Sequence, residues 1–171
     1  MEMETDRSSS AQPPRLEVVV LVGLQGAGKS TFRGQRFTNT HVIVSKDLIR
    51  NNRRPDRRQR QLIVAALASG MSVVVDKTNP SVGERASIIE AARGRATHLV
   101  GYFFESPLRD CAARNDLRPP STRVPDVGLF AAAKRLVRPS KTEGFDELWI
   151  VRTLPELRFD VLPYEDSHEP R

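Results

Sequence analysis

Positions 23–30 carry the residues whose types and spacing point most clearly to chemistry. They read Gly-Leu-Gln-Gly-Ala-Gly-Lys-Ser, which fits the pattern GxxxxGK[ST]. An apolar run precedes the motif and an amphipathic segment follows it, so it lies between a strand and a helix. Glycines let backbone amides turn inward around phosphate oxygens near the positive end of a helix. We therefore predict that this loop binds a nucleotide through Gly23, Gln25, Gly26, Ala27, Gly28, Lys29, Ser30 and Thr31.

Two side chains of this loop have separate expected roles. Lys29 reaches the β and γ phosphates, and the Ser30 hydroxyl holds Mg²⁺. This assignment predicts ATP and Mg²⁺ as cofactors, with Lys29 also counted among the catalytic residues. The alternative is a glycine-rich strand-to-helix turn in which the Lys-Ser pair is incidental.

A phosphate-binding loop serves GTPases, motor ATPases and kinases, so residues elsewhere must separate these classes. The guanine-reading segment NKxD is absent, and Lys77 stands where many motor ATPases place a catalytic glutamate. Transfer of the γ-phosphoryl group to a hydroxyl needs a carboxylate near that hydroxyl and cations over the phosphate. Both are available, which favours a kinase.

Two aspartates follow predicted strands at the edge where the phosphate loop lies. Asp47 comes after "HVIVS" and is the candidate general base, although Ser45 or Asp47 serving as a helix cap is the alternative. Asp76 ends "MSVVVD" and is a candidate to hold a Mg²⁺-bound water or to orient the acceptor. An N-cap or Asx-turn is an equal alternative for Asp76.

Arg114 and Arg118 are four residues apart, so a helix would present them on one face. The Pro-rich stretch "RPPST" follows and suits a mobile lid, which we place at about 109–140. Two arginines closing over ATP would stabilise the transferring charge as catalytic residues. A solvated helix face is the alternative.

The densest positive stretch is 50–60, "RNNRRPDRRQR", with six arginines and one acid. Arginine makes up 22 of the 27 basic residues, and the net charge is +6, which favours polyanionic partners. Beside an acceptor pocket, this stretch would track the phosphates of a nucleic-acid strand without reading its sequence. An exposed helix face with excess arginine is the alternative.

Apolar runs alternate with helical stretches, which predicts an α/β fold with a doubly wound parallel five-stranded sheet and a small helical lid. The predicted strands are 16–22, 41–45, 71–76, 97–104 and 147–151. Helices are expected to start at Gly28, near Lys46, around Arg57, at Ser81, at Ser106 and near Pro125. Ser81 and Glu84 form a predicted capping box.

The length of 171 residues favours one domain, at 16–162, between polar segments 1–15 and 163–171 that we expect to be disordered. Cys111 lies in a helical pattern and is expected to be a packed or half-exposed thiol. We find neither a secretory h-region nor 18 consecutive apolar residues, so the expected location is cytoplasmic, with no membrane partner.

Taken together, the phosphate loop, "VSKDLIR", "VVVDKTNP", "CAARNDLRPPSTRVP" and "RPSKTEGFDELWIV" resemble the 5′-hydroxyl kinase domain of polynucleotide kinases. The resemblance covers 16 to about 152 and implies a P-loop kinase fold. It implies Asp47 as the general base, Arg50 as the ligand of the acceptor's neighbouring phosphate, and Arg114 and Arg118 as the lid arginines. The segment from Asp76 to Pro80, including Asn79, falls on the acceptor side.

The comparison with this family shows one further similarity and two differences. The stretch from Glu143 to Phe145 also looks similar. Lys46 replaces the arginine commonly found before the catalytic aspartate, and no phosphatase or ligase pattern accompanies the kinase motifs. The same fold serves gluconate, nucleoside and antibiotic kinases and zeta-type toxins.

The leading hypothesis is an ATP- and Mg²⁺-dependent kinase that phosphorylates the 5′-hydroxyl ends of DNA or RNA. A kinase of a small hydroxyl acceptor, such as a nucleoside, a sugar or an antibiotic, is the nearest alternative. A nucleotide-binding switch without turnover is the alternative from another class.

Overall fold

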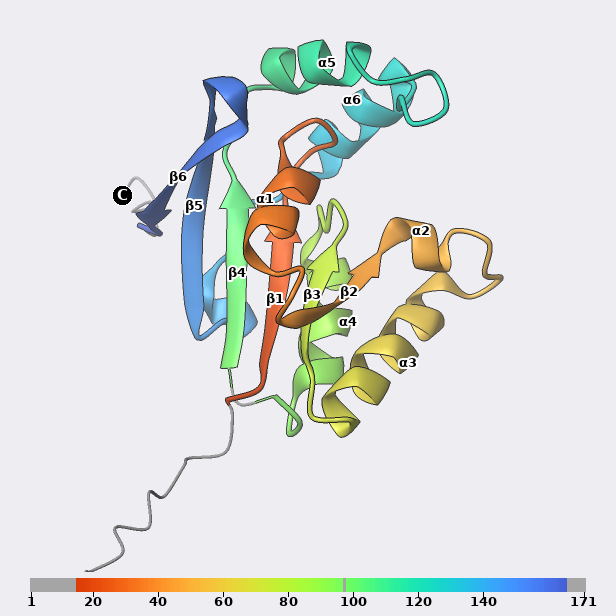
Figure 1. Ribbon diagram of the computed structural model, residues 1–171, viewed down its shortest axis with the longest axis vertical. Helices are drawn as coiled ribbons and strands as arrows, with labels where there is room; N and C mark the ends of the chain where they lie inside the picture. The colour runs from red at the N-terminus through yellow and green to blue at the C-terminus, as the bar shows by residue number, and fades with distance from the viewer. Residues whose placement is uncertain (1–14, 97, 166–171) are drawn as a thin grey trace, which may run out of the picture.

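The computed structural model describes residues 15–96 and 98–165 as one twisted sheet with helices packed on both of its faces (Figure 1). The strands are β1 Glu17–Val22, β2 His41–Ser45, β3 Ser72–Asp76, β4 His98–Phe104, β5 Glu147–Leu154 and β6 Arg158–Pro163. The α-helices are α1 Lys29–Arg36, α2 Lys46–Ile49, α3 Pro55–Ala68, α4 Val82–Ala92, α5 Leu108–Asp116 and α6 Asp126–Arg135. Two 3₁₀ turns, η1 Lys141–Glu143 and η2 Pro155–Leu157, flank β5.

The strand order in the sheet is β2-β3-β1-β4-β5-β6. The first five strands in this order run parallel, and β6 runs antiparallel to β5. Helical crossovers join the parallel strands, so their carboxyl ends meet at one edge, where doubly wound proteins bind ligands. Figure 1 shows α5 and α6 beyond this edge, close to the start of α1. The predicted α/β, doubly wound fold is confirmed.

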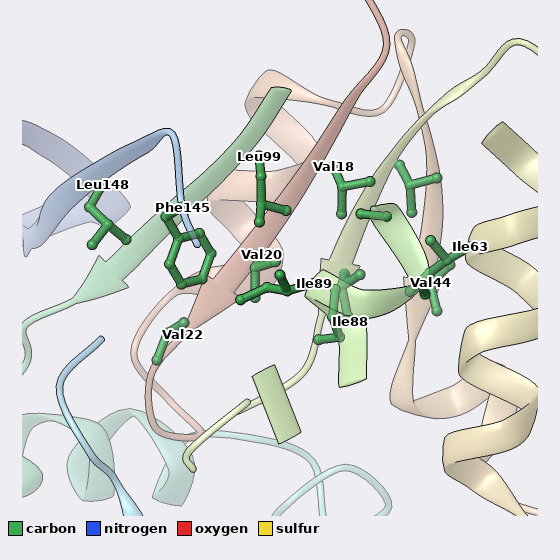
Figure 2. Packing of buried hydrophobic residues seen from close by; sticks show 14 of the residues in the cluster. Val18, Val20, Val22, Val44, Ile63, Ile88, Ile89, Leu99, Phe145 and Leu148 are labelled. Atoms are coloured by element: carbon green, nitrogen blue, oxygen red, sulfur yellow. The ribbon is translucent and has the colours of Figure 1, made fainter. Parts of the chain in front are cut away.

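The valine-rich run of β1 is buried from both sides. Val18, Val20 and Val22 lie in a core with residues of α3 and α4, which Figure 2 shows around Ile63, Ile88 and Ile89. Val19 and Leu21 point to the opposite core, which contains residues of α1, α5 and α6. A strand covered on both faces needs a continuous apolar run, because neither face is in contact with water.

The predicted count of five strands was wrong, because β6 adds a sixth and β5 continues three residues beyond the predicted end at position 151. Glu156 and Leu157, in the turn between these strands, have φ values of 61° and 52°. Hairpin turns with such left-handed residues usually contain Gly or Asn. The stretch "LPELR" lacks that signal, so its hairpin could not be recognised from local sequence.

Other boundaries follow the sequence closely. The capping box of Ser81 and Glu84 is confirmed at the start of α4. Helix α5 begins at Leu108 instead of the predicted Ser106, with Pro107 as its N-cap.

The expected polar ends are shorter in the structure than in the prediction. Pro163 belongs to β6 and Tyr164 is buried, so the packed chain continues past the expected start of the tail at 163. At the other end, the Arg15 guanidinium lies 2.6 Å from Nδ1 of His98. Positions 1–14 and 166–171 of the expected tails lie outside the described residues. Within the described ranges, we find no helix that is both long and apolar enough to cross a bilayer.

Candidate active site

The glycine-rich loop connects β1 to α1, with backbone conformations that only glycine adopts easily. Gly28 has a φ of 94° and is the N-cap of α1. Gly26 has a φ of 78°, and a Cβ there would collide with the carbonyl oxygen of Cys111 in α5. Both positions therefore require glycine, and Gly26 lets α5 approach the loop. Both glycines lie in the stretch from Gly23 to Thr31 that we predicted to bind a nucleotide.

Neighbouring elements hold the loop from several directions. The Gly23 amide donates a hydrogen bond of 3.0 Å to the carbonyl oxygen of Thr78, which follows β3. The Thr153 hydroxyl, near the end of β5, donates a hydrogen bond of 2.7 Å to the carbonyl oxygen of Ala27. The loop is therefore positioned by contacts from both sides of β1.

The Lys29 ammonium is buried inside the curve of the loop. It donates hydrogen bonds to the carbonyl oxygens of Gly23 and Leu24, at 2.8 and 2.6 Å. Burial lowers its pKa from 10.5 to about 8, and the positive charge of Arg118 acts in the same direction, against the opposing effect of Asp76. A buried ammonium inside a loop of inward-turned amides is well placed to bind phosphate oxygens.

Ser30 and Asp76, the two predicted metal ligands, are in contact. The Ser30 hydroxyl donates a hydrogen bond of 3.0 Å to Oδ2 of Asp76, at the end of β3. Mg²⁺ in phosphate-transfer sites is bound through one or two carboxylates together with substrate phosphates. A hydroxyl and a carboxylate beside the phosphate loop fit that donor set. The contact places Asp76 beside the phosphate loop.

Arg33 is a site residue that the sequence interpretation missed. Its guanidinium forms an ion pair of 2.8 Å with the same Oδ2 atom of Asp76. Arg33 lies three residues after Ser30 on α1, so both side chains are on one helix face. The spacing of Ser30 and Arg33 could have indicated that both residues contact the same group. That group, Asp76, can be identified only when β3 is known to lie beside β1.

Asn79 has a different position from the acceptor contact that we predicted. Its side chain is 1% exposed, and its amide donates a hydrogen bond of 2.7 Å to the carbonyl oxygen of Leu21. Its φ of 45° lies in the left-handed region, which asparagine tolerates better than most residues. Asn79 therefore ties the segment after β3 to the end of β1, directly before the phosphate loop.

A buried ion pair supports the segment that contains Asn79. The fully buried Arg85 of α4 donates to both carboxylate oxygens of Glu143 in η1, at 2.8 and 2.9 Å. It also donates to the carbonyl oxygens of Asn79 and Pro80. Glu143 belongs to the stretch that the resemblance singled out, and the structure gives it this positioning role.

Helices α5 and α6 lie within the predicted lid at about 109–140, and α5 contacts the phosphate loop through Arg114. Arg114 of α5 donates a hydrogen bond of 2.9 Å to the carbonyl oxygen of Gly26. Arg118 lies just after α5, and its backbone amide bonds to the carbonyl oxygen of Asn115. Beyond the effect of burial, the positive charge of Arg118 lowers the pKa of Lys29 in that loop. Of the two predicted lid arginines, Arg114 is hydrogen-bonded to the phosphate loop, while the charge of Arg118 acts on Lys29.

Two further residues of α5 are buried and serve packing. The side chain of Asn115 makes two hydrogen bonds, of 2.7 and 3.0 Å, with the backbone of Val124, which closes the lid loop. Cys111 is buried, and burial raises the pKa of its thiol, as expected of a packed cysteine.

Asp47 and Arg50 lie on or beside α2, which follows β2 at the carboxyl edge of the sheet. Ser45, the last residue of β2, pairs in register with Asp76 in β3. Asp47 follows Ser45 by two residues, so its backbone lies close to the strand neighbour of Asp76, the candidate metal ligand. Arg50 is the C-cap of α2 and is exposed.

The arginine cluster, which we define as Arg50, Arg53, Arg54, Arg57, Arg58 and Arg60, continues from α2 into α3, and every member is exposed. Within the described part of the chain, no ion pair involves any of these six side chains. The six arginines outnumber the single acid of the same stretch, Asp56, so this surface is positive.

Comparison with known proteins identifies the family. A family model described as "AAA domain" matches residues 18–138, more than half of the chain. The chain is 26% identical over 144 residues to a putative bifunctional polynucleotide phosphatase/kinase of Acanthamoeba polyphaga mimivirus, covering 80% of this chain and 33% of that protein. It is 27% identical over 181 residues to the bifunctional polynucleotide phosphatase/kinase of Schizosaccharomyces pombe. This match covers 94% of this chain and 40% of that protein. The chain thus spans less than half the length of either relative.

Solved structures share the fold at low identity. A fungal RNA kinase has a TM-score of 0.61 with 15% identity, covering 83% of this chain and 77% of that one. A gluconokinase from Sinorhizobium meliloti has a TM-score of 0.60 with 21% identity, covering 85% of this chain and 86% of that one. The family match and the phosphate loop after β1 lead to one conclusion: the chain belongs to the AAA domain family and has the fold of P-loop kinases.

Proposed function

We propose that this protein is an ATP- and Mg²⁺-dependent kinase that transfers the γ-phosphoryl group to the 5′-hydroxyl end of DNA or RNA. The observation that carries the choice of acceptor is the exposed arginine cluster without ion pairs, directly after α2. Unneutralised arginines beside an active site suit a polyanionic acceptor, whereas a small neutral acceptor would have no use for them. The two polynucleotide phosphatase/kinase relatives support the same acceptor class.

The phosphate loop, the pair of metal-ligand candidates, the lid arginines and the residues of α2 have separate proposed roles. Lys29 donates to the β and γ phosphates, while Arg114 and Arg118 stabilise charge on the transferring group. When bound at Ser30 and Asp76, Mg²⁺ supplies charge neutralisation for the β and γ oxygens. Asp47 accepts the proton of the attacking hydroxyl, and Arg50 binds the neighbouring phosphate of the acceptor strand.

The first test is label transfer from γ-labelled ATP to 15-nucleotide DNA and RNA with 5′-hydroxyl or 5′-phosphate ends. We expect transfer only to the 5′-hydroxyl strands. The Asp47→Ala variant should lower kcat by about 10²- to 10⁴-fold with nucleotide affinity retained. Asp160→Ala, an exposed carboxylate in β6, is the matched control and should behave as the unmodified protein.

The same assay separates the competing functions. Transfer to nucleosides, sugars or aminoglycosides but to no oligonucleotide would replace the proposal with a small-molecule kinase. ATP binding without transfer to any hydroxyl would indicate a nucleotide-binding switch. Full activity of Asp47→Ala would remove that residue from the role of general base.

A further inference from the structure

An open groove of about 370 Å³ lies between α3 and α4, away from the phosphate loop. Figure 1 shows both helices on the same face of the sheet. Three arginines and one acid account for the charges of its lining, which consists of Arg57, Arg60, Gln61, Val64, Glu90, Ala91 and Arg95. The groove is therefore positive. Two of its arginines, Arg57 and Arg60, belong to the arginine cluster, and none of its lining residues belongs to the phosphate loop.

The arginines of this groove are available to a ligand. Arg57 and Arg60 are exposed, and neither forms an ion pair with any described residue, including Glu90. Arg95 lies across the groove from them, and its guanidinium donates a hydrogen bond of 3.5 Å to the carbonyl oxygen of Ala91. Arginines of α3 and of the turn after α4 thus line one space that has a single carboxylate among its lining residues, a charge balance that favours a phosphate group.

The groove continues the arginine surface that begins beside the acceptor side of the active site. Arg57 and Arg60 are two and five residues after Pro55, the first residue of α3. At about 1.5 Å per helical residue, the groove begins within roughly 8 Å of the start of that helix. A stacked strand advances by about 3.4 Å per nucleotide, so a strand that follows α3 reaches the groove within roughly two nucleotides of the start of that helix.

We propose that the α3–α4 groove is a second phosphate-binding subsite, which holds the backbone of the acceptor strand roughly four or more nucleotides from its 5′ end. This subsite rests on the proposed function, because it extends the acceptor site of the same reaction. It confers a preference for longer strands without reading their sequence. Its contribution is to binding of the acceptor, whereas the chemical step depends on residues at the carboxyl edge of the sheet.

The test compares 3-nucleotide and 15-nucleotide 5′-hydroxyl acceptors with the Arg57→Gln/Arg60→Gln double variant. For the longer acceptor we expect KM to rise roughly tenfold, and the slope of log affinity against log salt to become less steep by about 1.4, since each single-strand phosphate contact contributes about 0.7. For the short acceptor KM should be unchanged, and kcat should be unchanged for both.

The control is Lys141→Gln/Arg158→Gln, which removes the same charge at exposed positions in η1 and β6. This variant should keep the KM values and the salt slope of the unmodified protein. Equal behaviour of the two double variants on both acceptors, in a protein that does phosphorylate 5′ ends, would overturn the subsite and leave the proposed function standing. Absence of transfer by the unmodified protein to any oligonucleotide would instead overturn the proposed function.

Discussion

The buried ammonium of Lys29 has a lowered pKa that a bound phosphate would raise again. Among the described residues its ammonium donates hydrogen bonds to the loop's own carbonyl oxygens alone, and burial lowers its pKa to about 8. A nucleotide phosphate would supply the missing negative charge and favour the protonated form. Binding and protonation of Lys29 are therefore coupled.

This coupling predicts a pH dependence of ATP affinity. Below about pH 7.5 the free protein already carries protonated Lys29, so the contribution of this lysine to affinity should be constant. Above pH 8 the free protein loses that proton, and affinity should fall by up to about tenfold per pH unit. Titration calorimetry between pH 7 and 9.5 measures this effect. Lys29→Met should bind more weakly with no such decline, and an equally steep decline in that variant would contradict the assignment.

At the scale of elements, the segment after β3 depends on the ion pair between α4 and η1. Arg85 and Glu143 are both shielded from water, with side-chain exposures of 0% and 7%. Through Arg85 the pair also bonds the carbonyl oxygens of Asn79 and Pro80. Such a pair is weak evidence for net stability, but removing one partner leaves the other buried without compensation.

A double-mutant cycle tests this pair. Arg85→Met and Glu143→Ala should each lower the free energy of unfolding by about 3–5 kcal/mol, whereas the double variant should lose less than the sum of the two. Urea denaturation measures these values. Arg135→Ala, which removes the more exposed pair with Glu84, should cost no more than about 1 kcal/mol. Additive losses at Arg85 and Glu143 would show that the two side chains act independently.

At the scale of the whole molecule, the phosphate loop is held by parts of the chain that are far apart in sequence. Thr78 follows β3, Arg114 belongs to α5, and Thr153 lies near the end of β5, and each is hydrogen-bonded to the backbone of the loop. A ligand that stabilises the loop should therefore stabilise the core and the lid as one unit.

Nucleotide binding should accordingly raise the stability of the entire fold. At an ATP concentration of about 100 Kd with Mg²⁺, the free energy of unfolding should increase by about 2.7 kcal/mol in a single transition. Differential scanning calorimetry measures the shift, and Lys29→Met should respond far less at the same ATP concentration. A separate early transition that ATP abolishes would show instead that the lid unfolds independently of the core.

Features that depend on residues close together in the chain could be predicted from the sequence. The phosphate loop, the valine-rich strands, the capping box at Ser81 and the helix starts near Lys46 and Pro125 were all predictable. These features follow from local spacing, because a strand, a turn or a helix start is decided by interactions within a few residues. The placement of Asp76 near the loop also followed, since parallel strands end at the same edge.

The tertiary structure alone decided which distant residues meet. Strand β6 escaped prediction because its turn carries left-handed Glu156 and Leu157 without a glycine. Arg33 gained its partner Asp76 only through the adjacency of β1 and β3, and Asn79 proved to be bound to Leu21. The α3–α4 groove likewise requires Arg57 and Arg95 to be brought together across two helices. Such contacts depend on strand order and helix packing, which no local sequence pattern reports. The energy that selects these contacts comes from burial and pairing across the whole fold.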